Sequence, residues 1–125
     1  TTTATNPTAT SPIPVTITFS EAVTGFVVGD ITVGNGTASN FAGSGTTYTA
    51  DITPTVPGAV TVDVLANVAQ DAALNWNTAA TQLSITYDPS APTVTITTTA
   101  TNPTARIIKS ISREPPACAH EILII

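Results

Sequence analysis

The chain has 125 residues, 42% of them hydrophobic and only 9% charged, and its formal net charge is −5. That length accommodates one domain of ordinary size. Residues 1–105 carry six acidic side chains and no basic one, which excludes binding to nucleic acid or to anionic membranes, since both need Lys or Arg. No apolar run is long enough for membrane insertion and residues 1–20 show no signal-peptide pattern, so we expect an internal excerpt or a mature fragment.

Threonine supplies most of the polar surface, with 27 residues that all lie between Thr1 and Thr104. Threonine is β-branched and favours pleated sheet, whereas the helix formers Met and Leu number zero and four. Ten prolines and seven glycines divide the chain into short segments. The composition therefore predicts an all-β domain.

Six segments show the strand character and bounding turns that are typical of a half-buried sheet. In chain order they are residues 13–20, 26–33, 37–42, 47–53, 60–65 and 82–87. Turn sequences separate them, among them Gly34-Asn35-Gly36, Gly43-Ser44-Gly45 and residues 54–58. With a seventh strand at 92–99, this spacing predicts an immunoglobulin-like β-sandwich of about seven antiparallel strands.

One nine-residue segment occurs twice in the chain. Residues 1–9 (TTTATNPTA) recur letter for letter as residues 97–105, an offset of 96 residues. A period near 100 residues is typical of one β-sandwich per repeat and is much longer than that of solenoid repeats. We therefore predict that residues 1–92 are one repeat lacking most of its first strand, and that residues 93–105 begin the next repeat.

Residues 106–125 differ in composition from the rest of the chain. They contain no threonine, hold all three basic residues, the only cysteine and the only histidine, and end in an apolar run. We expect this segment to be a non-native or out-of-frame tail.

The segment around Val94 and Ile96 has strong strand character but follows the repeat that it would complete. Three interpretations are open for it. It is a dangling strand, a strand that fills the vacated sheet edge within the chain or by swapping, or a disordered linker.

The most specific sequence motifs lie between residues 13 and 105. They read PVTITFSEAVTGF (14–26), GDITV (29–33), NGTASNF (35–41), GTTY (45–48), AQDAA (69–73) and YDPSAPTV (87–94). Together they resemble the bacterial Ig-like (Big) domains that form long arrays in surface adhesins. The resemblance implies a β-sandwich that acts as a spacer, a stalk or a ligand-presenting module. In the loop after Asp71 the family usually carries glycines, where this chain has Leu74 and Trp76.

Residues 1–105 contain neither His nor Cys. No serine there has an obvious general base, so the side chains needed for nucleophilic catalysis are missing from this part of the sequence. A carboxylate pair for glycoside chemistry is the remaining enzymatic alternative. Asp51 and Asp63, however, fall on outward positions of their strands and are interpreted as solvated acids. We predict that the chain is not an enzyme.

Calcium is the one cofactor that the residues suggest. Asp71, Asn75 and Asn77 gather oxygen ligands within one loop, and Asp88 lies at the predicted junction between repeats. Glu21 and Asp30 are further donors for either position. The spacing is not that of an EF-hand, and the same residue types are typical of Asx turns, so both interpretations stay open.

Trp76, the only tryptophan, is expected on that same loop, where it either packs over the end of the sandwich or contacts a ligand such as a sugar. The predicted function is a structural spacer or stalk repeat of a large bacterial cell-surface or secreted adhesin. Its partners are the neighbouring repeats of the same chain. Two alternatives are a module that binds a host or cell-surface glycan or protein, and an accessory domain of an exported polysaccharide-degrading enzyme.

Overall fold

The computed structural model of the chain describes residues 1–101. The predicted tail (106–125) and the last residues of the predicted second repeat (102–105) lie outside the described residues. Contacts divide the chain between Ala91 and Pro92 into two units, which are described separately. The assignment of residues 1–92 and 93–105 to successive repeats stays a prediction.

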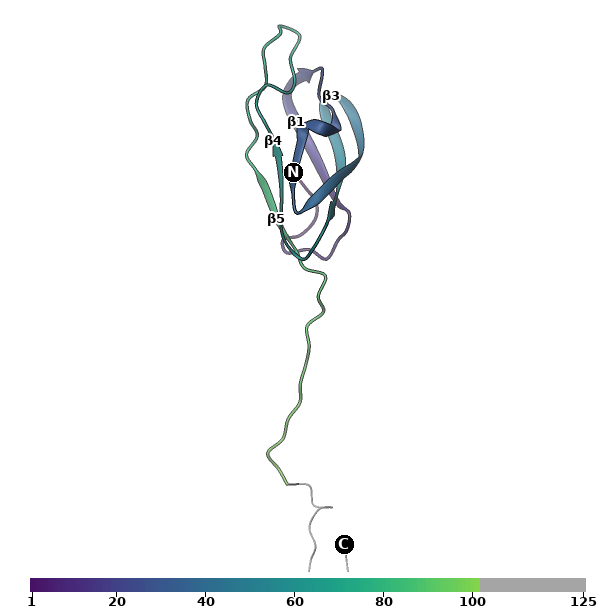
Figure 1. Cartoon of the computed structure of the whole chain (residues 1–125), viewed down its shortest axis with the longest axis vertical. Coiled ribbons are helices and arrows are strands. Elements are labelled where there is room, and N and C mark those ends of the chain that lie inside the picture. The colour runs from purple at the N-terminus through teal and green to yellow at the C-terminus, as the bar shows by residue number, and fades with distance from the viewer. Residues whose placement is uncertain (102–125) are drawn as a thin grey trace, which may run out of the picture. The chain divides into compact units, whose positions relative to one another are not determined.

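Residues 1–91 form two antiparallel sheets, which Figure 1 shows as β1 and β3 on one side and β4 and β5 on the other. The first sheet pairs β1 (Ile13–Val23) with β3 (Gly36–Pro54). The second has the order β2–β4–β5, formed by Ile31–Gly34, Gly58–Val64 and Leu83–Tyr87. The predicted all-β, immunoglobulin-like sandwich is confirmed. Within residues 1–101, no helix has the length and apolar character needed to cross a membrane.

The long element β3 folds back on itself at residues 43–45. The Asn40 amide donates a hydrogen bond of 3.0 Å to the Asp51 carboxylate across the two arms. Gly43 lies so close to the second arm that a Cβ there would come within 2.7 Å of the Cα of Tyr48. Its φ of 121° is also open only to glycine, so the turn depends on this residue. The strands predicted at 37–42 and 47–53 are therefore the two arms of β3.

The strand predicted at 26–33 is wrong over its first half. Only β2 is a strand, because the preceding residues form a short 3-10 helix, η1 (Val28–Asp30). The Asp30 carboxylate accepts a hydrogen bond of 2.9 Å from the Val27 N–H, and the Asp30 N–H donates one of 3.0 Å to the Val27 carbonyl. A short acidic side chain that bonds to nearby backbone in this way competes with pairing to a neighbouring strand.

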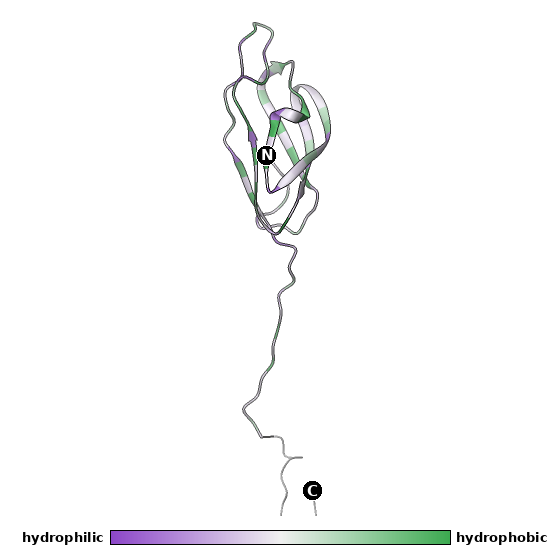
Figure 2. Ribbon diagram, in the orientation of Figure 1, coloured by the Kyte–Doolittle hydropathy of each residue, from purple (hydrophilic) through white to green (hydrophobic). Residues whose placement is uncertain are grey.

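The core lies between the two sheets and follows the alternation along the strands, which appears in Figure 2 as hydrophobic residues recurring along each ribbon. Ile52 and Val60, from opposite sheets, are both 0% exposed. The other buried hydrophobic residues are Ile13, Val15, Val23, Phe26, Ile31, Tyr48, Ala50, Val62, Val64, Ala69 and Ile85. Asp51 and Asp63 alternate with these residues, as expected of outward positions.

Four aromatic rings pack together at one end of the core. The Phe26 ring lies edge-on to those of Phe19 and Tyr48, with centroids 5.1 Å apart in each case. Phe41 stacks on Tyr48 with a centroid distance of 5.6 Å. Because edge-on and offset aromatic pairs are favourable beyond their burial, this cluster stabilises the end of the sandwich that also carries the site described below.

The N-terminal segment joins the two sheets. Thr1 exchanges two backbone hydrogen bonds with Thr16 on β1, of 2.6 and 2.8 Å. Further along, Thr8 forms a parallel bridge with Tyr87 of β5, and its carbonyl accepts the Asp88 N–H at 2.8 Å. The first and last extended segments of this unit therefore lie side by side and run in the same direction.

Residues 92–101 contain no assigned strand. The side chains of Val94 and Ile96 are 86% and 94% exposed, which makes them the most exposed large hydrophobic residues of the described chain. The segment thus has strand sequence without a strand partner among residues 1–101.

Candidate functional site

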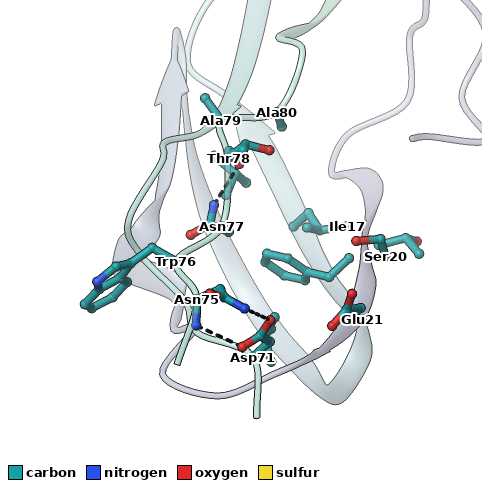
Figure 3. Close-up of a pocket in the computed structure, with 14 residues that line it drawn as sticks. Ile17, Ser20, Glu21, Asp71, Asn75, Trp76, Asn77, Thr78, Ala79 and Ala80 are labelled. Atoms are coloured by element: carbon teal, nitrogen blue, oxygen red, sulfur yellow. Dashed lines mark hydrogen bonds between the residues drawn. The ribbon is translucent and has the colours of Figure 1, made fainter. Parts of the chain in front are cut away.

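A cleft of about 350 Å³ opens at the end of the sandwich where β1 and β4 terminate (Figure 3). One side is formed by the second half of β1, from Ile17 to Val23, and the other by residues 71–80 of the connection between β4 and β5. Four of the predicted site residues line it: Asp71, Asn75, Trp76 and Asn77. Glu21 lies across the cleft from them in Figure 3.

A second, smaller cavity of about 190 Å³ continues the cleft along β1 as far as Thr1. The two cavities share four lining residues: Ile17, Thr18, Val64 and Ala80. They therefore form one depression that follows β1 from the N-terminal segment to Glu21, and we call it the β1 groove. Its polar end lies at Asp71 and Glu21, whereas its middle is apolar.

Asp71 organises the loop at the polar end. Its Oδ1 accepts hydrogen bonds from the N–H groups of Ala73 and Asn75, at 2.8 and 2.9 Å, and its Oδ2 accepts one of 3.0 Å from the Asn75 side chain. These donors, the Asn75 side chain first and its backbone next, hold the pKa of the Asp71 carboxyl below its ordinary value of 3.8. The predicted Asx turn is therefore present, with an ionised carboxylate at its centre.

The Asn77 side chain also stabilises this loop, through both the oxygen and the nitrogen of its amide. Its Oδ1 accepts the N–H groups of Val68 and Ala69, each at 2.9 Å. Its Nδ2 donates to the carbonyls of Leu65 and Thr78, each at 2.9 Å. One side chain thus ties the end of β4 to the segment that leads into β5.

Leu74 has the backbone conformation of a glycine. Its φ is 67°, in the left-handed region that a branched side chain adopts at a cost, and its side chain is 72% exposed. The loop keeps this shape because the Leu74 N–H donates to the Asp71 carbonyl at 3.1 Å. Leu74 therefore holds a backbone conformation that glycine adopts without steric cost.

Trp76 lies on the rim of the cleft and is 56% exposed. Figure 3 shows its indole pointing away from Ile17 and Glu21, so the ring does not fill the apolar part of the groove. Its backbone pairs with Gln70 as an isolated antiparallel bridge, which fixes where the ring projects. The side chain is available for contact with a ligand outside the cleft.

The structure does not bring Asp88 to this loop. Asp88 follows Tyr87, which pairs with Gly58 at the start of β4, whereas Asp71 and Asn75 follow the other end of β4. The Asp88 carboxylate accepts the Ser90 N–H at 3.0 Å. Within residues 1–101, no three His, Cys, Asp or Glu side chains are grouped closely enough to hold a metal ion. Calcium binding by Asp71, Asn75 and Asn77 stays a prediction, with Glu21 as the nearest additional acid in the cleft.

Ile17 and Phe19, which were expected only as residues of a half-buried strand, both line the groove. Both lie just beyond Thr16, the β1 residue that pairs with Thr1.

Two sheets, a core of alternating aliphatic residues and parallel outer segments define an immunoglobulin-like domain. Residues 1–87 match the family described as bacterial Ig-like domain, and the chain belongs to that family. Membership indicates a structural domain of the kind typically found in bacterial extracellular or surface proteins. No curated protein and no solved structure matches the chain.

Proposed function

We propose that this domain is a spacer repeat of a large bacterial surface or secreted adhesin, with a mechanical and not an enzymatic role. The observation that carries the proposal is the parallel bridge between Thr8 and Tyr87. Because the first and last segments of the domain run in the same direction, the chain enters at one end of the sandwich and leaves at the other. Such domains can follow one another head to tail in a tandem array, because the linker does not have to reverse the direction of the chain.

The register of the strands identifies the two ends. β1 runs from Ile13, opposite Ile52, to Val23, opposite Gly45. The end with Val23 also carries the loop at residues 67–77, because Thr24 bridges Gln70, and we call it the loop end. The end with Gly58 and Tyr87 is the exit end, where the chain leaves toward the next predicted repeat.

The connection that leaves the exit end supports a stiff array. Asp88 to Pro92 contains two prolines in five residues, and proline fixes φ and favours extended backbone. The Asp88 N–H bonds back to Thr8, so the connection starts from a fixed point on the domain. The neighbouring repeats of the same chain are the partners that this arrangement requires.

Small-angle X-ray scattering of chains that contain one, two and three copies of the 96-residue period tests the proposal. An 11-residue strand such as β1 spans about 36 Å, so we expect the maximum dimension to grow by a constant ~40 Å per repeat. Replacing Pro89 and Pro92 by Gly in the same chains should shorten the average dimension. Repeats that collapse onto one another, with no constant increment, would overturn the spacer role.

A binding module is the second candidate, because Trp76 presents an indole that is 56% exposed on the rim of a cleft. A glycan array and a pull-down with bacterial and host surface proteins, using the chain and its Trp76→Ala variant, separate the two functions. If the domain is a spacer, neither the chain nor its Trp76→Ala variant should give a binding signal in either assay. A signal that Trp76→Ala abolishes, with an unchanged melting temperature, would establish the binding function instead.

A further inference from the structure

Asn35 lies between β2 and β3 at the exit end, and each polar atom of its side chain has a backbone partner. Its Nδ2 donates hydrogen bonds to the carbonyls of Val56 and Ala59, at 2.9 and 3.1 Å, and its Oδ1 accepts the Val56 N–H at 3.2 Å. The Asn35 carbonyl also accepts the Thr55 N–H at 3.1 Å. One half-buried residue therefore joins the end of β2 to the turn between β3 and β4.

The glycines on both sides of Asn35 are required by close packing. A Cβ at Gly34 would overlap the Thr61 hydroxyl, and one at Gly36 would lie 2.8 Å from the Thr53 carbonyl oxygen, a backbone atom that cannot rotate away. Asn35 itself has a φ of 57°, which asparagine tolerates better than most residues. The fold thus requires an asparagine that is followed directly by a glycine.

An Asn-Gly pair is prone to deamidation, because glycine has no Cβ to hinder the reaction. The backbone nitrogen of Gly36 attacks Cγ of Asn35, so that a new N–Cγ bond forms, the Cγ–Nδ2 bond breaks, and the proton leaves with the amide nitrogen as ammonia. Water then opens the succinimide ring and gives aspartate or isoaspartate at position 35. Asn35 is the only asparagine in the sequence with glycine after it.

We propose that Asn35 is a deamidation site that the folded domain protects and the unfolded chain exposes. The attack requires Cγ to turn toward the Gly36 nitrogen, and in the folded chain this rotation breaks the three side-chain hydrogen bonds to Val56 and Ala59. The unfolded chain has no such restraint, so the reaction follows the population of unfolded molecules. The inference goes beyond the spacer role and does not depend on it.

Either product weakens the folded domain. An aspartate at position 35 has no N–H to donate, so the carbonyls of Val56 and Ala59 lose their donor and face a negative charge. Isoaspartate adds a methylene to the main chain directly before Gly36, where the backbone lies against the Thr53 carbonyl. A domain that stays unfolded long enough to react therefore does not recover its original stability.

Peptide mass spectrometry of the full chain tests the protection. The chain is incubated in mildly alkaline buffer, with and without guanidinium chloride at a concentration that unfolds it. We expect deamidation of Asn35 to be at least about tenfold slower in the folded chain. Asn40, Asn67 and Asn75 are each followed by a larger residue and serve as internal controls that react much more slowly in denaturant. Equal rates at Asn35 with and without denaturant would overturn the proposal.

Refolding after increasing times in denaturant tests the consequence of the reaction. We expect the fraction of chains that regain the original melting temperature to fall in step with the fraction deamidated at Asn35. Chains that are deamidated at this position and still recover the original melting temperature would contradict the proposal.

The Asn35→Asp variant isolates the effect of the aspartate product. We expect the equilibrium constant for folding, measured by denaturant titration, to fall by about tenfold or more. Asn67→Asp is the matched control, because Asn67 also has a positive φ, of 64°, and its side chain is exposed and has no hydrogen-bond partner among residues 1–101. The same change of charge there should alter the constant by less than about threefold. Equal losses in the two variants would show that the contacts of the Asn35 amide do not matter.

Discussion

The hydroxyl of Tyr48 donates a hydrogen bond of 3.2 Å to the carbonyl of Val23. Both residues are buried, and the bond spans the irregular stretch of the β1–β3 register between Thr18 and Val23. It therefore fixes the end of β1, on which one side of the cleft is built, at the point where regular ladder pairing is interrupted.

Tyr48→Phe removes this bond and little else, because the ring keeps its place among Phe19, Phe26 and Phe41. We expect the free energy of unfolding to fall by ~1 kcal/mol, the usual net value of one buried hydrogen bond. Urea denaturation measures this. Tyr87→Phe is the matched control, since the described part of the chain shows no partner for the Tyr87 hydroxyl. Equal effects of the two variants would contradict the assigned role of Tyr48.

Asn77→Ala removes four hydrogen bonds that hold the loop against the end of β4. We expect a loss of ~2–3 kcal/mol in the free energy of unfolding, because the backbone groups of Val68 and Ala69 lose a partner in a partly buried setting. Asn77→Asp keeps the two accepted bonds and should lose about half as much. Asn75→Ala, which removes one exposed side-chain bond, should cost less than about 1 kcal/mol. Denaturant titration of all three variants checks this order.

Leu74→Gly should stabilise the domain. The φ of 67° is unfavourable for leucine and free of cost for glycine, and the side chain, which is 72% exposed, contributes little burial. After allowing for the greater flexibility of glycine in the unfolded chain, we expect a gain of ~0.5–1 kcal/mol. The matched control is Leu65→Gly, at a site that is 56% exposed and does not have a positive φ, where stability should fall. A lower melting temperature for Leu74→Gly would contradict the cost assigned to the positive φ at Leu74.

Acid should weaken the loop through Asp71. The pKa of this carboxyl is lower in the folded chain than its ordinary value of 3.8, so its stabilising contribution is complete well above pH 3.8 and is lost as the pH falls through the folded-state pKa. Asp71→Asn removes that titration. We expect the melting temperatures of the two proteins to differ most near neutral pH and to converge as the pH falls through the folded-state pKa of Asp71, which lies below 3.8. A difference that stays constant across the pH range would show that Asp71 contributes through packing alone.

Most of the fold could be predicted from the sequence, because the alternation of apolar and polar residues reports directly on which face of a strand is buried. Val60, Val62 and Val64 are buried on one face of β4, as their spacing predicts. The alternation does not reveal hydrogen bonds between a side chain and the backbone of residues near it in the sequence. This is why the strand predicted at 26–33 begins only at Ile31, after the bond between Val27 and Asp30.

The candidate site was predictable only in part. The loop residues Asp71, Asn75, Trp76 and Asn77 were identified from their types, and they do line one cleft. The role of Asn77 depends on partners at Leu65 and Val68, which only the folded chain brings within reach. Asp88 was assigned to the junction between repeats and not to this loop, and β5 carries it to the other end of the sandwich.

The proposed spacer role depends on the parallel arrangement of the N-terminal segment and β5. Three hydrogen bonds hold the two together: from Thr86 to Asn6, from Thr8 to Thr86 and from Asp88 to Thr8, at 2.9, 2.9 and 2.8 Å. In a tandem array under tension, parallel neighbours whose outer ends are pulled apart are loaded in shear, so all three bonds must break together. Antiparallel end segments would separate one bond at a time.

Single-molecule force spectroscopy of a three-repeat chain tests this most directly. We predict a high and uniform unfolding force for each repeat, and a clear drop when Thr8→Pro removes the N–H that bonds to Thr86. Ala9→Pro, next to that position and outside the bridge, should leave the force close to the original value. An unfolding force that is low from the outset and unaffected by Thr8→Pro would contradict the proposed mechanical role of the domain.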